Sequence, residues 1–451
     1  MSRAVSLWEE TAGPATAYRG EVPASVDAVI VGGGLTGLWT AYCLLEHRPD
    51  LSVLVLEAEH VGFGASGRNG GWVSALWPVS PDVVAARHGR AATLDLLAAL
   101  RETVDEVGAR ARAEGINAGF VKGGALSAVR TPAQERRARA EVAHSRRWGT
   151  GTVWLDSEAA RERLAAEGML GATFSPHCAR VHPRRLVDGL AAAVTRRGAL
   201  IREGLRVGRL SPGVVVLEDG RRVSARHVLR ATEAWTSQVP GHERDVAPVY
   251  SLMVATEPLS AQRWAAIGLG AREVFTDHGH VVIYGQRTGD DRIAFGGRGA
   301  PYHFSSRIRP EFDREERVFA DLSRTLRELL PQLDDVAVTH TWGGPLGVAR
   351  DWHPSVGYAH GVGWAGGYVG DGVAATNLAG RTLADLVLER PSRLSTLPWV
   401  GHRSPRWEPE PVRWLGINGG LRLAHLADRE ERWSRSPPRL SGLLARLTGG
   451  H

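Results

Sequence analysis

The sequence of 451 residues has only two cysteines, Cys43 and Cys178. Two cysteines cannot form a disulfide framework in a chain of this length, and neither has the CxxC or Cys/His spacing of a zinc site. We therefore expect no bound metal. The sequence also lacks any apolar run approaching the roughly 20 residues that a membrane span requires. These absences favour a reducing interior and predict a cytoplasmic protein without a membrane span.

Lysine is almost missing as well, because arginine takes its place everywhere except at Lys122. The formal net charge is +6, from 55 basic and 49 acidic residues, and the two signs are interleaved along the chain. Interleaved charges predict a solvated surface rather than a basic patch. With 43% hydrophobic residues the composition is typical of a globular protein. We expect no nucleic-acid partner, and the oligomeric state stays open.

Strand and helix patterns change along the chain. Apolar runs at 26–31 and 51–57 predict two buried parallel strands joined by a helix, a βαβ unit. Asp219-Gly220 and the sequence TGDD predict hairpin turns in a later region of antiparallel strands. Thr131, Pro132 and Gln134 predict a capped helix start, and the last long helix is expected at 373–389.

The predicted fold class is α/β, with a Rossmann-like domain interleaved with an antiparallel-β substrate domain. The predicted boundaries are 1–21 for an extended arm, 22–80, 182–240 and 338–400 for the Rossmann-like domain, 81–181 and 241–337 for the substrate domain, and 401–451 for a tail. The tail segment RWLGINGGLRLAHLADREERW predicts an amphipathic helix. It could dock a partner or a membrane surface, but packing on the Rossmann-like domain is favoured.

Gly32, Gly34 and Gly37 form a G-x-G-x-x-G motif between the first strand and its helix. The first glycine allows a tight turn, the second lets the backbone approach a pyrophosphate, and the third lets helix and strand pack closely. Glu57 stands 20 residues after Gly37, at the end of the second strand. Its carboxylate can accept both ribose hydroxyls and would repel the 2′-phosphate of NADP. The unit is therefore predicted to bind FAD or NAD.

Two further glycine-rich segments favour FAD. Residues 62–73 read GFGASGRNGGWV, a loop whose backbone can lie against a flat ring, and residues 363–388 place a glycine-rich turn before a helix. The N-terminus of that helix can stabilise negative charge on reduced flavin. The predicted FAD-binding residues are Gly32, Gly34, Leu35, Thr36, Gly37, Glu57, Ala58, Gly64, Ala65, Ser66, Arg68, Asn69, Gly70, Gly71, Val207, Thr232, Gly344, Gly367, Gly370, Gly372 and Val373.

Several motifs resemble the D-amino-acid-oxidase-like superfamily of FAD-dependent oxidoreductases, a D-amino-acid-oxidase/glutathione-reductase-like fold. They are VIVGGGLTG, GASGRNGG, ARVHPRRL, HVLRAT and AGGYVGDGV, and the resemblance covers about residues 25–400. SGRNGG with GGYVGDGVAATNLAGRTLADL is most similar to the γ-glutamylputrescine oxidase branch. The resemblance implies oxidation of the C–N bond of a primary or secondary amine to an imine, with O2 as acceptor giving H2O2. No cysteine follows Cys178, so it also implies non-covalent FAD.

The sequence departs from its relatives where substrate and oxygen bind. The two arginines that hold a carboxylate in glycine-oxidase-like members correspond to Leu346 and Gly370 here, which argues against a small α-amino acid unless Arg298 or Arg350 substitutes. The alternative is therefore oxidation of an amino acid or aminophosphonate. A dehydrogenase using another acceptor also stays open, because Lys122 lies in a different segment from the lysine that activates oxygen in sarcosine-oxidase-like members.

Arg350, Asp351 and Asp371 are the predicted catalytic residues, since they occupy loops expected to cross the ring. Asp371 stands where the putrescine branch usually has His. Its carboxylate could bind a cationic amine or take its proton, but it would also disfavour the anion of reduced flavin. The predicted pocket walls, whose aromatic members could equally be core residues, are Tyr250, Tyr284, Arg298, Tyr302, Trp342, Trp352 and Tyr368.

Two other functions are disfavoured by the sequence. A flavin monooxygenase should show Ala-Ala-His after the Gly-Asp of the last flavin loop, whereas Gly370-Asp371 is followed by Gly-Val-Ala. A non-enzymatic flavoprotein that assembles a partner complex would rest only on the Trp- and Arg-rich tail. An enzyme acting on a small-molecule amine is therefore predicted.

Overall fold

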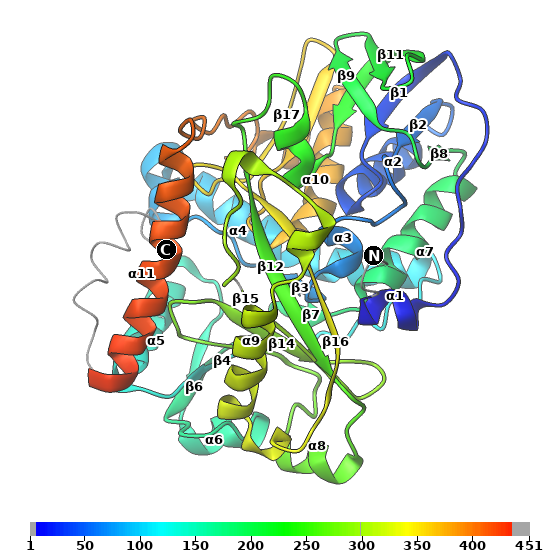
Figure 1. Cartoon of the computed structure of the whole chain (residues 1–451). Coiled ribbons are helices and arrows are strands. Elements are labelled where there is room, and N and C mark those ends of the chain that lie inside the picture. The colour runs from blue at the N-terminus through cyan, green and yellow to red at the C-terminus, as the bar shows by residue number, and fades with distance from the viewer. Residues whose placement is uncertain (1–5, 298, 435–451) are drawn as a thin grey trace.

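The computed structural model describes residues 6–297 and 299–434, and within them the chain forms two large sheets (Figure 1). The first sheet has the order β17-β18-β11-β1-β2-β8, with β9 and β10 added beside β11. Parallel pairing joins β1 to β2 and β11, as the βαβ pattern predicts. The bounds are β1 Ser25–Val31, β2 Val53–Leu56, β8 Leu200–Arg202, β9 Val207–Ser211, β10 Val214–Leu217, β11 Arg222–Arg230, β17 Ser355–Ala359 and β18 Val362–Gly366.

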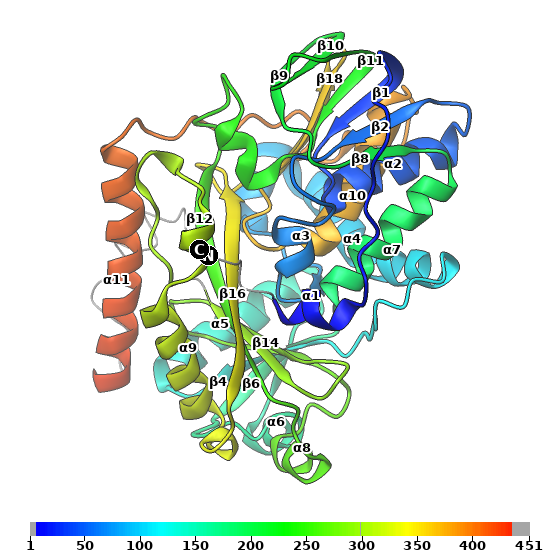
Figure 2. The ribbon, with the colours of Figure 1, turned by 45° about the vertical axis from the view of Figure 1, so that its right-hand side comes forward.

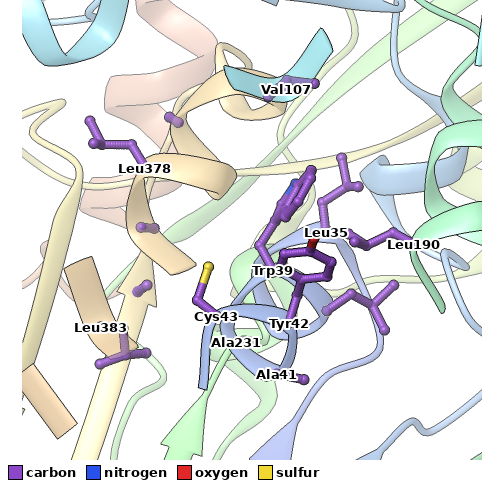
Figure 3. Close-up of a cluster of buried hydrophobic side chains, with 14 of the residues drawn as sticks. Leu35, Trp39, Ala41, Tyr42, Cys43, Val107, Leu190, Ala231, Leu378 and Leu383 are labelled. Carbon is purple, nitrogen blue, oxygen red and sulfur yellow. The ribbon is translucent and has the colours of Figure 1, made fainter. Parts of the chain in front are cut away.

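Helices cover one face of this sheet, and the β9–β10 hairpin covers part of the other. Because both faces are buried, β1 and β2 can be continuous apolar runs without alternating polar residues. Figure 3 shows Trp39 and Cys43 on one helix near Leu378 and Leu383 on another. The helices of this layer are α2 Leu35–His47, α4 Pro81–Ala113, α7 Pro183–Arg196 and α10 Gly372–Val387.

The second sheet has the order β16-β12-β15-β14-β13-β4-β6-β5 and is antiparallel except where β13 pairs with β4. It lies in the lower part of Figure 2, below the first sheet. Its strands are β4 Ala125–Val129, β5 Val153–Leu155, β6 Gly171–Ser175, β12 Ala247–Thr256, β13 Val274–Asp277, β14 Ile283–Arg287, β15 Ile293–Gly297 and β16 Val338–Val348. The helices associated with it are α5 Pro132–Trp148, α6 Ser157–Arg163, α8 Ala261–Ile267 and α9 Glu316–Leu329. A short ribbon, β3 Trp72–Ser74 with β7 Cys178–Arg180, stands apart from both sheets.

Local signals in the sequence match the structure closely. The Thr131 hydroxyl accepts the Gln134 N–H at the start of α5, and the Gln134 side chain accepts the Arg130 N–H. Gly220 has φ 87° in the turn between β10 and β11. A kink at Gly89, which has φ 83°, divides α4 into two helical parts.

Three segments differ from the predicted boundaries. The arm contains a helix, α1 Leu7–Ala12, which Ser6 and Glu9 cap. The segment from 338 begins with β16, which pairs with β12 in the second sheet rather than joining the Rossmann-like domain. Helix α4, predicted in the substrate domain, packs instead against α10 of the Rossmann-like domain, through a buried core that includes Leu100, Val104 and Val107.

The predicted helix of the tail exists as α11, Val412–Ser434, but the favoured packing site was wrong. Glu431 accepts hydrogen bonds from Arg137 and Thr131, and Asp428 accepts the His280 and Val281 N–H groups. These partners belong to the substrate domain, so α11 spans its flank (Figure 1). Among residues 6–297 and 299–434, none of the helices has the length and hydrophobicity of a membrane span.

Candidate active site

A cavity of about 910 Å³ opens where the first sheet meets the second. It lies at the carboxyl ends of β1 and β2, which is where open parallel sheets bind ligands. One end is lined by Glu57 and Glu218, and the other by Arg68, Arg309 and Asp313. Residues from both sheets and from the segment before α9 therefore line one cavity, whose volume lies in the range of cofactor and small-molecule sites.

The glycine motif forms a tight cradle at the start of α2. Gly32 has φ 115°, and a Cβ there would lie 2.4 Å from the Ala231 carbonyl oxygen. A Cβ at Gly37 would lie 2.0 Å from the Gly32 carbonyl oxygen. The first turn of α2 carries no acidic residue, and its N-cap residue, Gly34, has no side chain. The positive end of the helix dipole therefore faces the cavity without an acidic residue of the helix itself to neutralise it.

Glu57 lies at the end of β2 with both carboxylate oxygens engaged by backbone. Its Oε2 accepts the Gly33 N–H at 2.7 Å and its Oε1 accepts the Glu59 N–H at 2.9 Å. Burial raises the pKa of Glu57, and these hydrogen bonds oppose the shift. Because each carboxylate oxygen can accept more than one hydrogen bond, ribose hydroxyls can still be bound.

The N-terminus of α10 reaches the same cavity from the other side of α2. Gly370, Gly372 and Val373 line the cavity there. The Tyr368 hydroxyl lies 3.1 Å from the Thr36 Oγ1, which ties the loop before α10 to the first turn of α2. Burial raises the pKa of Tyr368 far above its usual range, so the phenol stays neutral. Two helix N-termini thus meet at one cavity.

Arg68 and Asp313 form an ion pair in the wall of the cavity. The Arg68 Nη1 lies 2.5 Å from the Asp313 Oδ2, and the Arg68 side chain is only 5% exposed. The guanidinium also lies over the ring of Phe63, 5.3 Å from its centroid. Trp342 supports this arrangement by donating its Nε1–H to the Arg68 carbonyl oxygen at 2.9 Å. The pair connects α3, Ala65–Arg68, to the segment that precedes α9.

Most of the predicted FAD-binding residues gather at this cavity. The predicted residues that line it are Gly32, Gly34, Leu35, Thr36, Glu57, Ala58, Gly64, Ala65, Ser66, Arg68, Asn69, Val207, Thr232, Gly370, Gly372 and Val373. Gly37, Gly70, Gly71, Gly344 and Gly367 are not in its lining. The last group instead allows close approach of neighbours, as where a Cβ at Gly344 would lie 3.3 Å from the Arg68 Nη2.

The predicted catalytic residues lie in different surroundings. The Arg350 Nε donates to Glu408 at 2.9 Å, and the Asp351 Oδ2 lies 2.8 Å from the His402 Nε2. Neither residue lines the cavity. Asp371 is the N-cap residue of α10, directly between the cavity-lining Gly370 and Gly372.

Of the predicted pocket walls, Tyr368 lines the cavity and the others that the structure describes do not. Tyr250 is fully buried, and its hydroxyl accepts the Arg309 N–H at 3.4 Å, so it supports a wall from behind. The Tyr284 hydroxyl lies 2.8 Å from the Ser251 Oγ, and the Tyr302 hydroxyl donates to Glu410 at 2.8 Å. Trp342 lies behind Arg68, and Trp352 packs at the edge of a core cluster with Val348. Arg298 lies outside the described residues.

Sequence reasoning missed several residues that line the cavity. They are Phe63, Glu233, Trp235, Gln238, Ile308, Arg309, Pro310, Asp313 and Pro345. Leu346, which the sequence aligns with a carboxylate-binding arginine of glycine-oxidase-like members, lines the cavity as well. Glu233 directly follows the predicted Thr232 and Trp235 lies three residues after it, so both are within reach of the strand end that the sequence predicts. The segment 308–313 carries no motif, and only the fold brings it beside Arg68.

The family model described as FAD dependent oxidoreductase, DAO, matches residues 27–386. The chain belongs to this family. The match spans the glycine motif, Glu57, Arg68 and the start of α10, which confirms the family that the motifs resemble. It also confirms FAD as the cofactor, and the cradle at Gly32 and Gly37, the Glu57 carboxylate and the two helix N-termini fit that group.

Individual relatives agree with this assignment. The chain is 29% identical over 382 residues to the gamma-glutamylputrescine oxidoreductase of Escherichia coli (strain K12), covering 82% of this chain and 86% of that protein. It is 28% identical over 379 residues to the probable oxidoreductase OrdL of Haemophilus influenzae, covering 82% and 84%. The structure of glycine oxidase from Geobacillus kaustophilus aligns with TM-score 0.69 and 24% identity, covering 85% of this chain and 100% of that one. The fold is therefore that of D-amino-acid-oxidase-like enzymes.

Proposed function

We propose that this FAD-dependent oxidoreductase oxidises the C–N bond of a primary or secondary amine to an imine. The observation that carries the proposal is the cavity itself, which continues beyond the helix N-termini to Arg68, Ile308 and Asp313. A small substrate can bind in this additional space while FAD occupies the cradle at the start of α2. The names of similar proteins support the substrate class, since one acts on gamma-glutamylputrescine and another on glycine.

In this proposal FAD supplies the hydride acceptor, and the chain supplies binding and electrostatics. The neutral amine would give a hydride from its α-carbon to the bound flavin and release a proton from its nitrogen to solvent, and water would then hydrolyse the imine to a carbonyl compound and an amine. Glu57 holds the adenosine ribose, and the α2 N-terminus faces the pyrophosphate. Asp371 stands at the α10 N-terminus, where its charge favours a cationic amine and opposes negative charge on the ring. FAD is held without a covalent bond, as both cysteines are buried outside the cavity lining.

We propose dioxygen as the electron acceptor, giving hydrogen peroxide. Lys122 pairs with Asp105 at 2.6 Å and does not line the cavity. Arg309 is a cation that does line it and makes no ion pair within the described residues, and positive charge stabilises superoxide as it forms. The cytoplasmic location remains a prediction.

The test is anaerobic. The holoenzyme is mixed with matched amines, polyamines, amino acids and aminophosphonates, and bleaching of flavin absorbance is followed before air is readmitted. Bleaching by an uncharged or cationic amine and rapid recovery in air are expected. Bleaching only by anionic substrates would reject the amine class, and slow recovery would reject dioxygen as acceptor.

Arg309 favours the second candidate, an amino acid or aminophosphonate. Arg309 lines the cavity and is exposed, and it makes no ion pair within the described part of the chain. The other two cavity arginines are paired, Arg68 with Asp313 and Arg206 with Glu59 at 2.7 Å. If an anionic substrate bleaches the flavin, R309Q should raise its half-saturating concentration by up to about fivefold, and R307Q on the same loop should not.

A further inference from the structure

Glu233 occupies a backbone conformation that glutamate rarely adopts. It follows β11 within two residues of the cavity-lining Ala231 and has φ 43°. A left-handed conformation costs a non-glycine residue about 1–3 kcal/mol, so neighbouring contacts must hold it. The contacts of the Glu233 side chain therefore compensate for the strained backbone.

The Glu233 carboxylate connects its own segment, after β11, with two others, the loop before α10 and β16. Its Oε2 accepts the Gly367 N–H at 2.9 Å, in the loop before α10, and the backbones of Tyr368 and Gly347 lie close enough to lower its pKa. Gly347 belongs to β16. A Cβ at Gly347 or Gly366 would lie 3.0 or 2.9 Å from the carboxylate oxygens, so glycines at both positions leave room for it.

The same side chain borders the FAD site. Glu233 lines the cavity, as do Thr232, Trp235, Tyr368 and Gly370 on either side of it. Since Glu57 marks the adenosine end, Glu233 belongs to the part of the cavity beside the α10 N-terminus. A carboxylate here contributes charge to the cofactor as well as hydrogen bonds to the loop.

We propose that Glu233 is a positioning residue that ties the loop before α10 to β16 and couples the reduction of FAD to uptake of a proton. The proposal rests on FAD dependence and is independent of which amine is oxidised. With FAD bound, its two-electron reduction would add negative charge to the cavity that Glu233 lines. Glu233 then takes one proton from solvent, and the carboxylate becomes a neutral acid.

The groups facing Glu233 are few. Arg230 on the preceding strand is the nearby cation, and it also lies 3.8 Å from Asp245. Tyr368 faces it from the loop before α10 and stays neutral, while β16 contributes only backbone. Burial raises the pKa of Glu233 to about 7, although the backbone hydrogen bonds and Arg230 oppose the shift. Protonation is therefore accessible at ordinary pH.

The reduction potential of the holoenzyme tests the coupling without any amine substrate. For a two-electron couple, one additional proton adds about 29.6 mV per pH unit. Titration with dithionite and a reference dye, repeated between pH 6 and 9, should show this additional slope above about pH 7 in the unmodified protein. E233Q should lack it and should have a more positive potential at pH 8.

E243Q is the matched control, because Glu243 also accepts a glycine N–H, that of Gly241 at 2.9 Å, but is exposed and outside the cavity. It should behave as the unmodified protein. Equal slopes in E233Q and the unmodified protein would overturn the coupling. If E233Q fails to fold, absence of the added slope above pH 7 in the unmodified protein alone would overturn it.

FAD affinity tests the positioning role. E233Q should weaken FAD binding about tenfold in a flavin fluorescence titration of the apoprotein, and E233D, with its shorter side chain, should weaken it too while retaining the added slope. E243Q should leave affinity unchanged. Unchanged affinity in both Glu233 variants would overturn the positioning role. A holoenzyme that shows these effects but is bleached by no amine would separate this proposal from the proposed function.

Discussion

At position 37 even the smallest side chain, a methyl group, would clash with the backbone of Gly32. A Cβ at this position would lie 2.0 Å from the Gly32 carbonyl oxygen, so α2 packs on the β1 turn only because glycine is there. The sequence spacing anticipated this requirement, since the third glycine of the motif serves helix–strand packing. The role of Glu57 as an acceptor for the ribose hydroxyls could likewise be predicted from its position at the end of a strand.

Replacing Gly37 by alanine should separate α2 from the turn and disturb the pyrophosphate cradle. Overpacking of this kind costs about 1–3 kcal/mol. We expect G37A to lose at least that much unfolding free energy in urea and to purify with less FAD. G270A is the control, because nothing lies within 4 Å of the added methyl. Equal stability of both variants would contradict the packing role.

Glu57→Gln removes the charge that accepts ribose hydroxyls. Hydrogen bonds to charged groups contribute about 1.5–3 kcal/mol, so FAD should bind about 10- to 100-fold more weakly. Fluorescence titration of the apoprotein measures this, with exposed Glu21→Gln as the control. An unchanged dissociation constant for E57Q would place the ribose elsewhere.

Among the helices and strands, α11 shows what periodicity can and cannot predict. Its amphipathic pattern predicts a helix, because periodicity tells which side chains share a face, but it carries no information about which domain covers that face. Glu431 settles the packing in the folded chain, because it pairs with Arg137 at 2.7 Å and is 3% exposed. The same limit explains β16, whose pairing with β12 follows from tertiary contacts rather than composition.

Glu431 should make the stability of the protein depend on pH in the acid range. Burial would raise the pKa of Glu431, but the His280 ring 3.4 Å away and hydrogen bonds from Arg137 and Thr131 outweigh it and lower the pKa to about 2. A depressed pKa stabilises the fold above the unfolded value near 4.5, and that contribution is lost as pH falls toward 2. The contribution is about 3 kcal/mol at 1.36 kcal/mol per unit.

The measurement is urea unfolding at pH 6 and pH 3. E431Q should be less stable than the unmodified protein at pH 6, and the difference should shrink at pH 3. Exposed Glu162→Gln should show no such convergence. A constant gap between E431Q and the unmodified protein would mean that the pairing does not depend on ionisation.

Across the whole molecule, the cavity exists only because two interleaved domains meet. The first sheet contributes Gly32 and Glu57, while the segment before α9 contributes Arg309 and Asp313. A ligand held by both domains binds the folded state and not the unfolded one. FAD is therefore expected to stabilise the molecule as a unit.

Removal of FAD should lower the thermal unfolding midpoint of the whole chain. FAD at about 100 times its dissociation constant should stabilise the fold by about 2.7 kcal/mol. Calorimetry of apoprotein with FAD, with ADP and with neither provides the comparison, and ADP should restore only part of the midpoint because it reaches only the Glu57 end. Full restoration by ADP would show that the far end of the cavity adds no binding energy.

The family, the βαβ unit, the cofactor cradle and the acid at the end of β2 could all be predicted from the amino-acid sequence. These features depend on residues close together in the chain, where spacing translates directly into geometry. The folded chain was needed to show that Arg68 pairs with Asp313, that Arg350 and Asp351 have partners outside the cavity, and that Glu233 holds the loop before α10. Such contacts join residues more than 50 positions apart, and their partners are chosen by how the two sheets pack.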